Sequence, residues 1–208
     1  MLSQCPTTIP AEIRDYPKWR RGRKTYAVWI LRLGDETILE KFNTAREYLS
    51  GYLLEPYRRQ PHITLFVCGF LVEEPKYNDD FTSIQFESQI RALEEASIEP
   101  FEIEVGGLNS FASAPFLKVG DPDGGIARLR GALSHGAREF RTAPYTPHLT
   151  IGLYAAAFPS EEITAKLAVF HGKQIWLKVK QIAFVTYRAQ EIAGELTYRH
   201  KIALNTLR

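Results

Sequence analysis

The sequence predicts an α+β fold built from two related halves. One observation is a repeated pattern, Pro61-His62-Ile63-Thr64-Leu65-Phe66-Val67 and Pro147-His148-Leu149-Thr150-Ile151-Gly152-Leu153. A second is that strands and helices follow one another in a similar order around each copy. The composition agrees, since 208 residues with 45% hydrophobic and 24% charged side chains suffice for a globular domain with a sizeable core.

Hydrophobic periodicity places the elements of the first half. Residues 25–33 form an apolar run typical of a strand, and residues 35–54 carry apolar side chains at helical spacing. The first motif follows as a strand over residues 62–70, and residues 81–96 return to helical spacing. Residues 1–24 have no such pattern, so we expect a basic N-terminal extension there and a single domain over residues 25–208.

The second half repeats this order with an added hairpin. Strands are expected at residues 101–107 and 115–119, followed by a helix that opens at Asp121–Gly125 and runs to Ala137. The opening turn lacks the Gly-Lys-Ser/Thr ending of a P-loop, so no phosphate loop is predicted. The second motif strand spans residues 147–154, a helix spans 160–170, and strands at 173–187 and 195–204 are expected to pair as a hairpin.

Each motif places an imidazole and a hydroxyl on one face of a strand. Side chains alternate along a strand, so His62 lies beside Thr64, and His148 lies beside Thr150. Histidine has an ordinary pKa of about 6.5, so two of them can divide the roles of base and acid near neutral pH. The opposite, buried face is expected to hold the intervening apolar residues Ile63, Leu65, Val67, Leu149, Ile151 and Leu153. The simpler interpretation is structural: two strand-edge histidines form hydrogen bonds with neighbouring residues, and threonine is present because β-branched residues suit strands.

These motifs resemble those of the 2H phosphoesterases, which include bacterial 2′-5′ RNA ligases and cyclic nucleotide phosphodiesterases. The resemblance rests on His62-Ile63-Thr64 and His148-Leu149-Thr150, and extends over residues 25–205 through segments similar to the family's opening strand and central hairpin, Tyr26–Ile30, Phe101–Phe111 and Pro115–Val119. It implies two pseudo-symmetric lobes of mainly antiparallel sheet flanked by helices. The active-site cleft would lie between the lobes and take one motif from each.

The function expected from this resemblance is hydrolysis of a 2′,3′-cyclic phosphate or a 2′-5′ phosphodiester of RNA or small nucleotides, without a metal. The reverse reaction would be a 2′-5′ ligation. The expected catalytic residues are His62 and His148, in an order left open, and Thr64 and Thr150 would bind the phosphate. Side chains near the motifs that can stack on a base or meet a phosphate are candidates for substrate binding: Tyr57, Arg58, Phe111 and Tyr145.

Two other functions stay open. A non-catalytic module that binds RNA ends would keep the same cleft, and a metal-dependent hydrolase would use the two histidines as ligands. The second receives less support because no Cys or acidic residue completes a zinc-like spacing with either histidine. We therefore expect neither a metal nor another cofactor.

Cysteine content, net charge and apolar runs bear on disulfide bonds, nucleic-acid binding and cellular location. Cys5 and Cys68 do not suggest a disulfide framework, and Cys68 is expected on the site-facing side of its strand as a small packing residue. The net charge of +2 does not predict nucleic-acid binding, although the basic run around Trp19, residues 18–24, is either an RNA-gripping arm or a solvated tail. Without a signal core or a membrane-length apolar run, the expectation is a cytoplasmic protein with no membrane partner. The resemblance implies a nucleotide or RNA-end substrate, and we expect a monomer.

Overall fold

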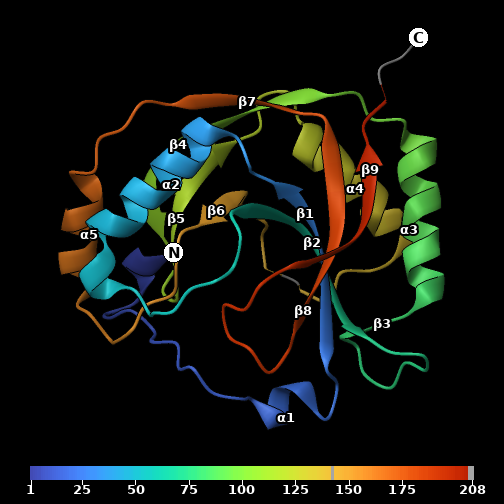
Figure 1. Cartoon of the computed structure of the whole chain (residues 1–208), viewed down its shortest axis with the longest axis horizontal. Coiled ribbons are helices and arrows are strands. Elements are labelled where there is room, and N and C mark those ends of the chain that lie inside the picture. The colour runs from blue at the N-terminus through green and yellow to red at the C-terminus, as the bar shows by residue number, and fades with distance from the viewer. Residues whose placement is uncertain (142, 206–208) are drawn as a thin grey trace.

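The computed structural model describes residues 1–141 and 143–205. Their strands form one nine-stranded sheet in the order β7-β4-β5-β6-β2-β1-β8-β9, with β3 parallel to β2 and every other pair antiparallel (Figure 1). The strands are β1 (Thr25–Arg32), β2 (His62–Leu71), β3 (Asp80–Phe81), β4 (Phe101–Ser110), β5 (Pro115–Gly120), β6 (His148–Thr150), β7 (Ile175–Val179), β8 (Gln181–Arg188) and β9 (Thr197–Ala203). The helical segments are η1 (Leu2–Gln4), α1 (Pro17–Arg20), α2 (Glu36–Tyr48), η2 (Ser50–Tyr52), α3 (Ser83–Ala96), α4 (Gly125–Gly136) and α5 (Ser160–Ala168).

The sheet divides into two corresponding halves. Reading outward from the centre, β2-β1-β8-β9 in one half matches β6-β5-β4-β7 in the other. The halves meet where β2 pairs with β6, through Ile63 opposite Leu149. In Figure 1, α2 and α5 lie beside the half that contains β4 and β5, and α3 and α4 lie beside the other. The predicted α+β class with two pseudo-symmetric halves is confirmed.

The main core lies between the helices and one face of the sheet. It includes residues from both halves, such as Trp29, Leu65 and Leu149, together with the apolar faces of α2, α3, α4 and α5. Burying one such side chain contributes about 1.5–3 kcal/mol. A second, smaller cluster contains Tyr26, Val28 and Val67 and no helix residue, so it lies on the opposite face of the sheet.

A β-bulge in β2 changes which residues face that side. Ile30 pairs with Thr64 but Trp29 pairs with Phe66, so Leu65 is an extra residue in the ladder. Beyond the bulge the alternation is reversed. Val67 therefore joins the smaller cluster, while Cys68 lies in the main core with 5% exposure, its Sγ 3.8 Å from Gln89 Oε1. The sides predicted for Val67 and Cys68 were wrong for this reason.

Other boundaries differ because tertiary contacts interrupt apolar runs. Helix α2 ends at Tyr48, before Ser50 and Gly51, rather than continuing to residue 54. The segment expected as one strand over residues 173–187 is two strands, since β7 pairs with β4 and β8 pairs with β1 in the other half. Only β8 pairs with β9.

The second motif strand is shorter than the eight residues predicted. It ends at Thr150, and the Arg46 guanidinium donates to the Ile151 carbonyl at 2.6 Å, a bond that a neighbouring strand would otherwise supply. Beyond this point the chain leaves the sheet. Leu153 consequently is half-buried and lines a cavity together with the motif side chains, and does not lie beneath the motif as predicted.

The first 24 residues pack against the rest of the chain. Leu2 and Thr8 are buried, and Thr8 Oγ1 donates to the Ala156 carbonyl at 2.8 Å. In the basic run, Arg23 forms ion pairs with Asp79 and Asp80, and the Trp19 ring packs on Phe70 with 4.8 Å between centroids. Part of the positive charge of this segment is therefore compensated inside the molecule. No helix in the described part of the chain is long and apolar enough to cross a membrane.

Candidate active site

The four motif side chains form a two-fold arrangement on the sheet face opposite the helices. The antiparallel pairing of Ile63 with Leu149, extended by one residue each way, puts His62 across from Thr150 and Thr64 across from His148. The two histidines thus occupy one diagonal and the two threonines the other. Diagonal neighbours in such a ladder are about 7–8 Å apart at Cα, which leaves room for one phosphate between the imidazoles.

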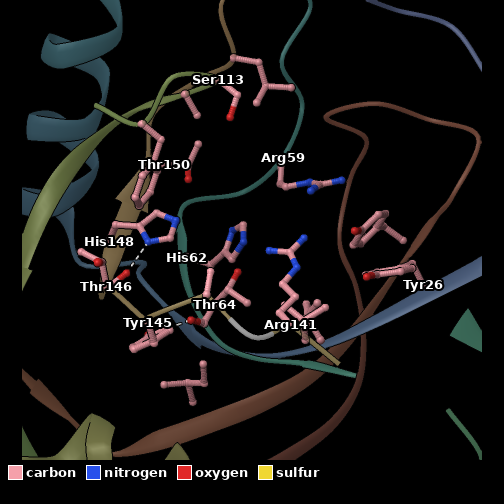
Figure 2. Close-up of a pocket in the computed structure, with 18 of the residues that line it drawn as sticks. Tyr26, Arg59, His62, Thr64, Ser113, Arg141, Tyr145, Thr146, His148 and Thr150 are labelled. Atoms are coloured by element: carbon pink, nitrogen blue, oxygen red, sulfur yellow. Dashed lines mark hydrogen bonds between the residues drawn. The ribbon is translucent and has the colours of Figure 1, made fainter. Parts of the chain in front are cut away.

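These side chains line a cavity of about 470 Å³. Figure 2 shows His62, His148, Thr64 and Thr150 around its centre. Pockets of about 300–1,000 Å³ are usual for small-molecule ligands, so the cavity has the volume of such a site and is larger than a bare phosphate requires.

Each imidazole is held by an equivalent hydrogen bond to a backbone carbonyl. His62 Nδ1 lies 2.7 Å from the Gln60 carbonyl, and His148 Nδ1 lies 2.6 Å from the Thr146 carbonyl, in each case two residues upstream. A carbonyl oxygen can only accept, so Nδ1 carries the proton in both rings. This leaves Nε2 of each ring to exchange a proton with a ligand, and the carbonyl stabilises the imidazolium that forms when Nε2 is protonated.

The environment favours the neutral form of both rings. The pKa of His62 is lowered from 6.5 to about 4, chiefly by burial and also by the positive charge of Arg59, against the opposing effect of the Gln60 carbonyl. Burial likewise lowers the pKa of His148, with Arg141 acting in the same direction. An anionic ligand between the rings would stabilise the protonated form of one of them.

Side chains replace a missing strand beside the bulge of β2. The pairing of β6 with β2 ends at Ile63, so the next backbone groups of β2 have no strand partner on that side. Tyr145 Oη donates to the Thr64 carbonyl at 2.9 Å, Arg130 donates to the Leu65 carbonyl, and the Val67 N–H donates to the Glu139 carboxylate at 3.0 Å. Arg130 and Glu139 also form an ion pair of 2.8 Å. This network fixes the backbone that carries Thr64.

Three of the four candidate substrate-binding residues line the cavity. The Phe111 ring packs edge-on against His148, with centroids 4.8 Å apart, and Tyr57 lies beneath the Arg46 guanidinium at 4.9 Å. Tyr145 lines the cavity too, although its hydroxyl is used by the Thr64 carbonyl. Arg58 does not line the cavity; its side chain is 60% exposed and lies 3.7 Å from the carboxylate of Glu191.

The structure adds residues that the sequence did not single out. Arg59, Arg141 and Tyr187 line the cavity. Arg59 follows Arg58 directly, and the Pro-His pattern gave no means of choosing between these two neighbours. Arg141 and Tyr187 lie outside both motifs, where a single arginine or tyrosine carries no periodic signal.

The described residues contain no group of three or more His, Cys, Asp or Glu side chains placed to hold a metal ion.

Comparison with known proteins identifies the family. The 2′-5′ RNA ligase superfamily model matches residues 35–191. Among solved structures, Escherichia coli LigT in apo form is similar with a TM-score of 0.57 and 16% identity over 89% of this chain and 100% of LigT. LigT complexed with 3′-AMP has a TM-score of 0.52 at 16% identity over the same shares. A Thermus thermophilus protein, TT0787, has a TM-score of 0.55 and 17% identity, over 86% of this chain and 97% of its own.

At these identities the structural matches establish the fold alone, and no curated protein matches the sequence. The family match spans both motifs and most of the sheet. The fold, the repeated motif and the matched profile together show that this chain belongs to the 2′-5′ RNA ligase superfamily of 2H phosphoesterases.

Proposed function

We propose that this protein hydrolyses 2′,3′-cyclic phosphates or 2′-5′ phosphodiesters of RNA ends or small nucleotides by two-histidine acid-base catalysis without a metal. The observation that carries the proposal is the equivalence of the two imidazoles. Each is fixed through Nδ1 to a backbone carbonyl, and each lines the same cavity next to a threonine. A pair of this kind suits in-line displacement at phosphorus, in which one side needs a base and the other an acid.

Each group has a defined part in the reaction. A neutral histidine takes a proton at Nε2 from water as the water oxygen attacks phosphorus. The protonated histidine gives its Nε2 proton to the departing ribose oxygen, so that the two rings exchange protonation states. The hydroxyls of Thr64 and Thr150 donate to the non-bridging oxygens, where negative charge grows in the transition state. In a 2′-5′ ligation the same groups act with roles exchanged.

In this proposal, His62 is the base and His148 is the acid in hydrolysis. Burial, Arg59 and the diagonally placed His148 all act to keep His62 neutral, against the opposing effect of the Gln60 carbonyl. The assignment is tested with bis(p-nitrophenyl) phosphate, whose leaving group needs no proton. Activity on this substrate should be substantially retained in His148→Ala and lost in His62→Ala. The opposite pattern would reverse the assignment.

The reaction itself is tested with nucleoside 2′,3′-cyclic monophosphates and a 2′-5′ dinucleotide. The wild-type protein should hydrolyse at least one of them, with full activity in EDTA. His62→Ala and His148→Ala should each reduce kcat by about 10²–10⁴. Sensitivity to EDTA would favour the metal-dependent alternative, and tight binding of RNA ends without turnover would favour the binding module.

LigT has been crystallised with ATP and with 3′-AMP. These complexes support the use of nucleotides as probes for the cavity of the present protein.

A further inference from the structure

Positive charge breaks the two-fold symmetry of the cavity. The motif residues are equivalent in the two halves, but the cavity-lining guanidinium groups are not. Figure 2 shows Arg59 and Arg141 on the side of His62 that faces away from His148, toward Tyr26. The position equivalent to Arg59, three residues before the second motif histidine, holds Tyr145. One end of the cavity is therefore cationic.

The charges at this end have no carboxylate partner among the described residues. Arg130 lines the cavity as well, but Glu139 neutralises it through their ion pair. Neither Arg59 nor Arg141 takes part in an ion pair within residues 1–141 and 143–205. Two uncompensated guanidinium groups lining one cavity repel each other and favour an anionic ligand.

Arg59 is also held in place before a ligand arrives. Its guanidinium lies over the Tyr187 ring at 4.1 Å, and its Nε donates to the Gly194 carbonyl at 3.2 Å. Gln60 fixes the same loop, because its side-chain amide donates to the Leu196 carbonyl and accepts from the Leu196 N–H. A pre-positioned arginine loses less conformational freedom on binding a phosphate. Its guanidinium forms no ion pair within the described residues, so its charge is available to a ligand.

The phosphate at the motif histidines does not require these charges. A cyclic phosphate or phosphodiester carries one negative charge, which the two threonine hydroxyls and one imidazolium already meet. The volume of about 470 Å³ extends beyond that position to the cationic end.

We propose that Arg59 and Arg141 form a second phosphate subsite, so that the preferred ligand is a nucleotide carrying another phosphate besides the one between His62 and His148. This inference rests on the proposed function for the place of the first phosphate. The subsite would favour RNA ends that carry a 5′-phosphate or a neighbouring phosphodiester over simple nucleoside cyclic monophosphates.

Equilibrium binding tests the subsite without requiring turnover. Calorimetric titration compares 3′-AMP with adenosine 3′,5′-bisphosphate, which differ by one phosphate. The wild-type protein should bind the bisphosphate about tenfold more tightly or better, as expected for a phosphate on two arginines. Arg59→Gln and Arg141→Gln should each reduce this preference to about threefold or less while changing 3′-AMP affinity little.

Arg138→Gln is the matched control. It removes the same charge from an exposed residue of the segment that leads to Arg141, and Arg138 does not line the cavity. The preference should persist in this variant. Equal binding of the two ligands by the wild type, or equal weakening of both ligands in the arginine variants, would overturn the subsite. Loss of the preference in Arg138→Gln as well would reduce it to a general charge effect and overturn it too. Because cyclic-nucleotide hydrolysis is measured separately, failure of the subsite is distinguishable from failure of the proposed function.

Discussion

At the scale of single residues, the two motif histidines combine burial with a fixed tautomer. The His62 and His148 rings each donate Nδ1–H to a backbone carbonyl, and both have lowered pKa values. Such rings favour the neutral form in the free protein. In the proposed mechanism, a bound phosphate would then stabilise the proton that the acid delivers, so that the acid is protonated when substrate is present.

This burial predicts a pH dependence of stability. The pKa of His62 is about 4 when folded and near 6.5 when unfolded, so below pH 6.5 the unfolded chain binds the proton first. Stability should therefore be full above pH 6.5 and fall as the pH decreases toward 4, by roughly 1–3 kcal/mol from this residue. Urea unfolding at pH 7 and pH 4.5 measures the loss.

The variant His62→Gln removes the titrating group and should show a smaller loss between these two pH values. His135→Gln, on the exposed side of α4, serves as the control and should lose as much as the wild type. An unchanged loss in His62→Gln would contradict the low pKa.

At this scale, the placement of the four motif side chains was predicted well from the sequence. The repeated His-x-Thr pattern identified the four residues that face one cavity, because strand alternation holds up to Thr64. The pattern did not extend to Arg59, since Arg58 and Arg59 are adjacent in a loop and only the tertiary fold decides which one lines the cavity.

At the scale of elements, the open edge of β2 is completed by side chains from the second half. Tyr145 donates to the Thr64 carbonyl, so Tyr145→Phe should misplace the Thr64 hydroxyl relative to the phosphate. We expect kcat to fall about threefold to tenfold with little change in KM, and stability to fall by about 1 kcal/mol.

Tyr48→Phe is the matched control for this prediction. Tyr48 Oη donates to the Lys166 carbonyl at the same 2.9 Å, away from the cavity. It should cost similar stability and leave kcat unchanged. If both variants had the same kcat as the wild type, Tyr145 would have only a structural role.

The backbone of β2 also depends on Gly69, which lies four residues after the bulge at Leu65. Gly69 has φ of +111°, and a Cβ there would lie 2.2 Å from the Asp79 carbonyl oxygen. Gly69→Ala should lower the free energy of unfolding by about 3 kcal/mol or more. Gly107→Ala, where a Cβ meets nothing within 4 Å, is the comparison in the same denaturation series. Equal stability of the two variants would contradict the described backbone.

Element boundaries show where sequence patterns lose information. A continuous apolar run located β1 and the motif located the start of β2, but the bulge at Leu65 reversed the sides of Val67 and Cys68 without a local marker. The division of β7 from β8 at Lys180 has no Gly or Pro either. It becomes visible only through their different partner strands, which are far away in the sequence.

At the scale of the whole molecule, the two halves share one core and one cavity. They are joined in the sheet through Ile63 and Leu149, and the main core includes apolar residues from both. We therefore propose that they unfold together. Calorimetry should give a single transition whose van't Hoff and calorimetric enthalpies agree, and two separate transitions would contradict a shared core.

The proposed catalysis also needs both halves, because each half supplies one histidine and neither motif is expected to work alone. Its most direct test is kcat/KM for a nucleoside 2′,3′-cyclic monophosphate in His62→Ala, His148→Ala and the double variant. If the histidines act as one unit, each single variant should lose about 10²–10⁴ and the double variant should lose little more than either. A single variant that retains activity close to that of the wild type would contradict the account.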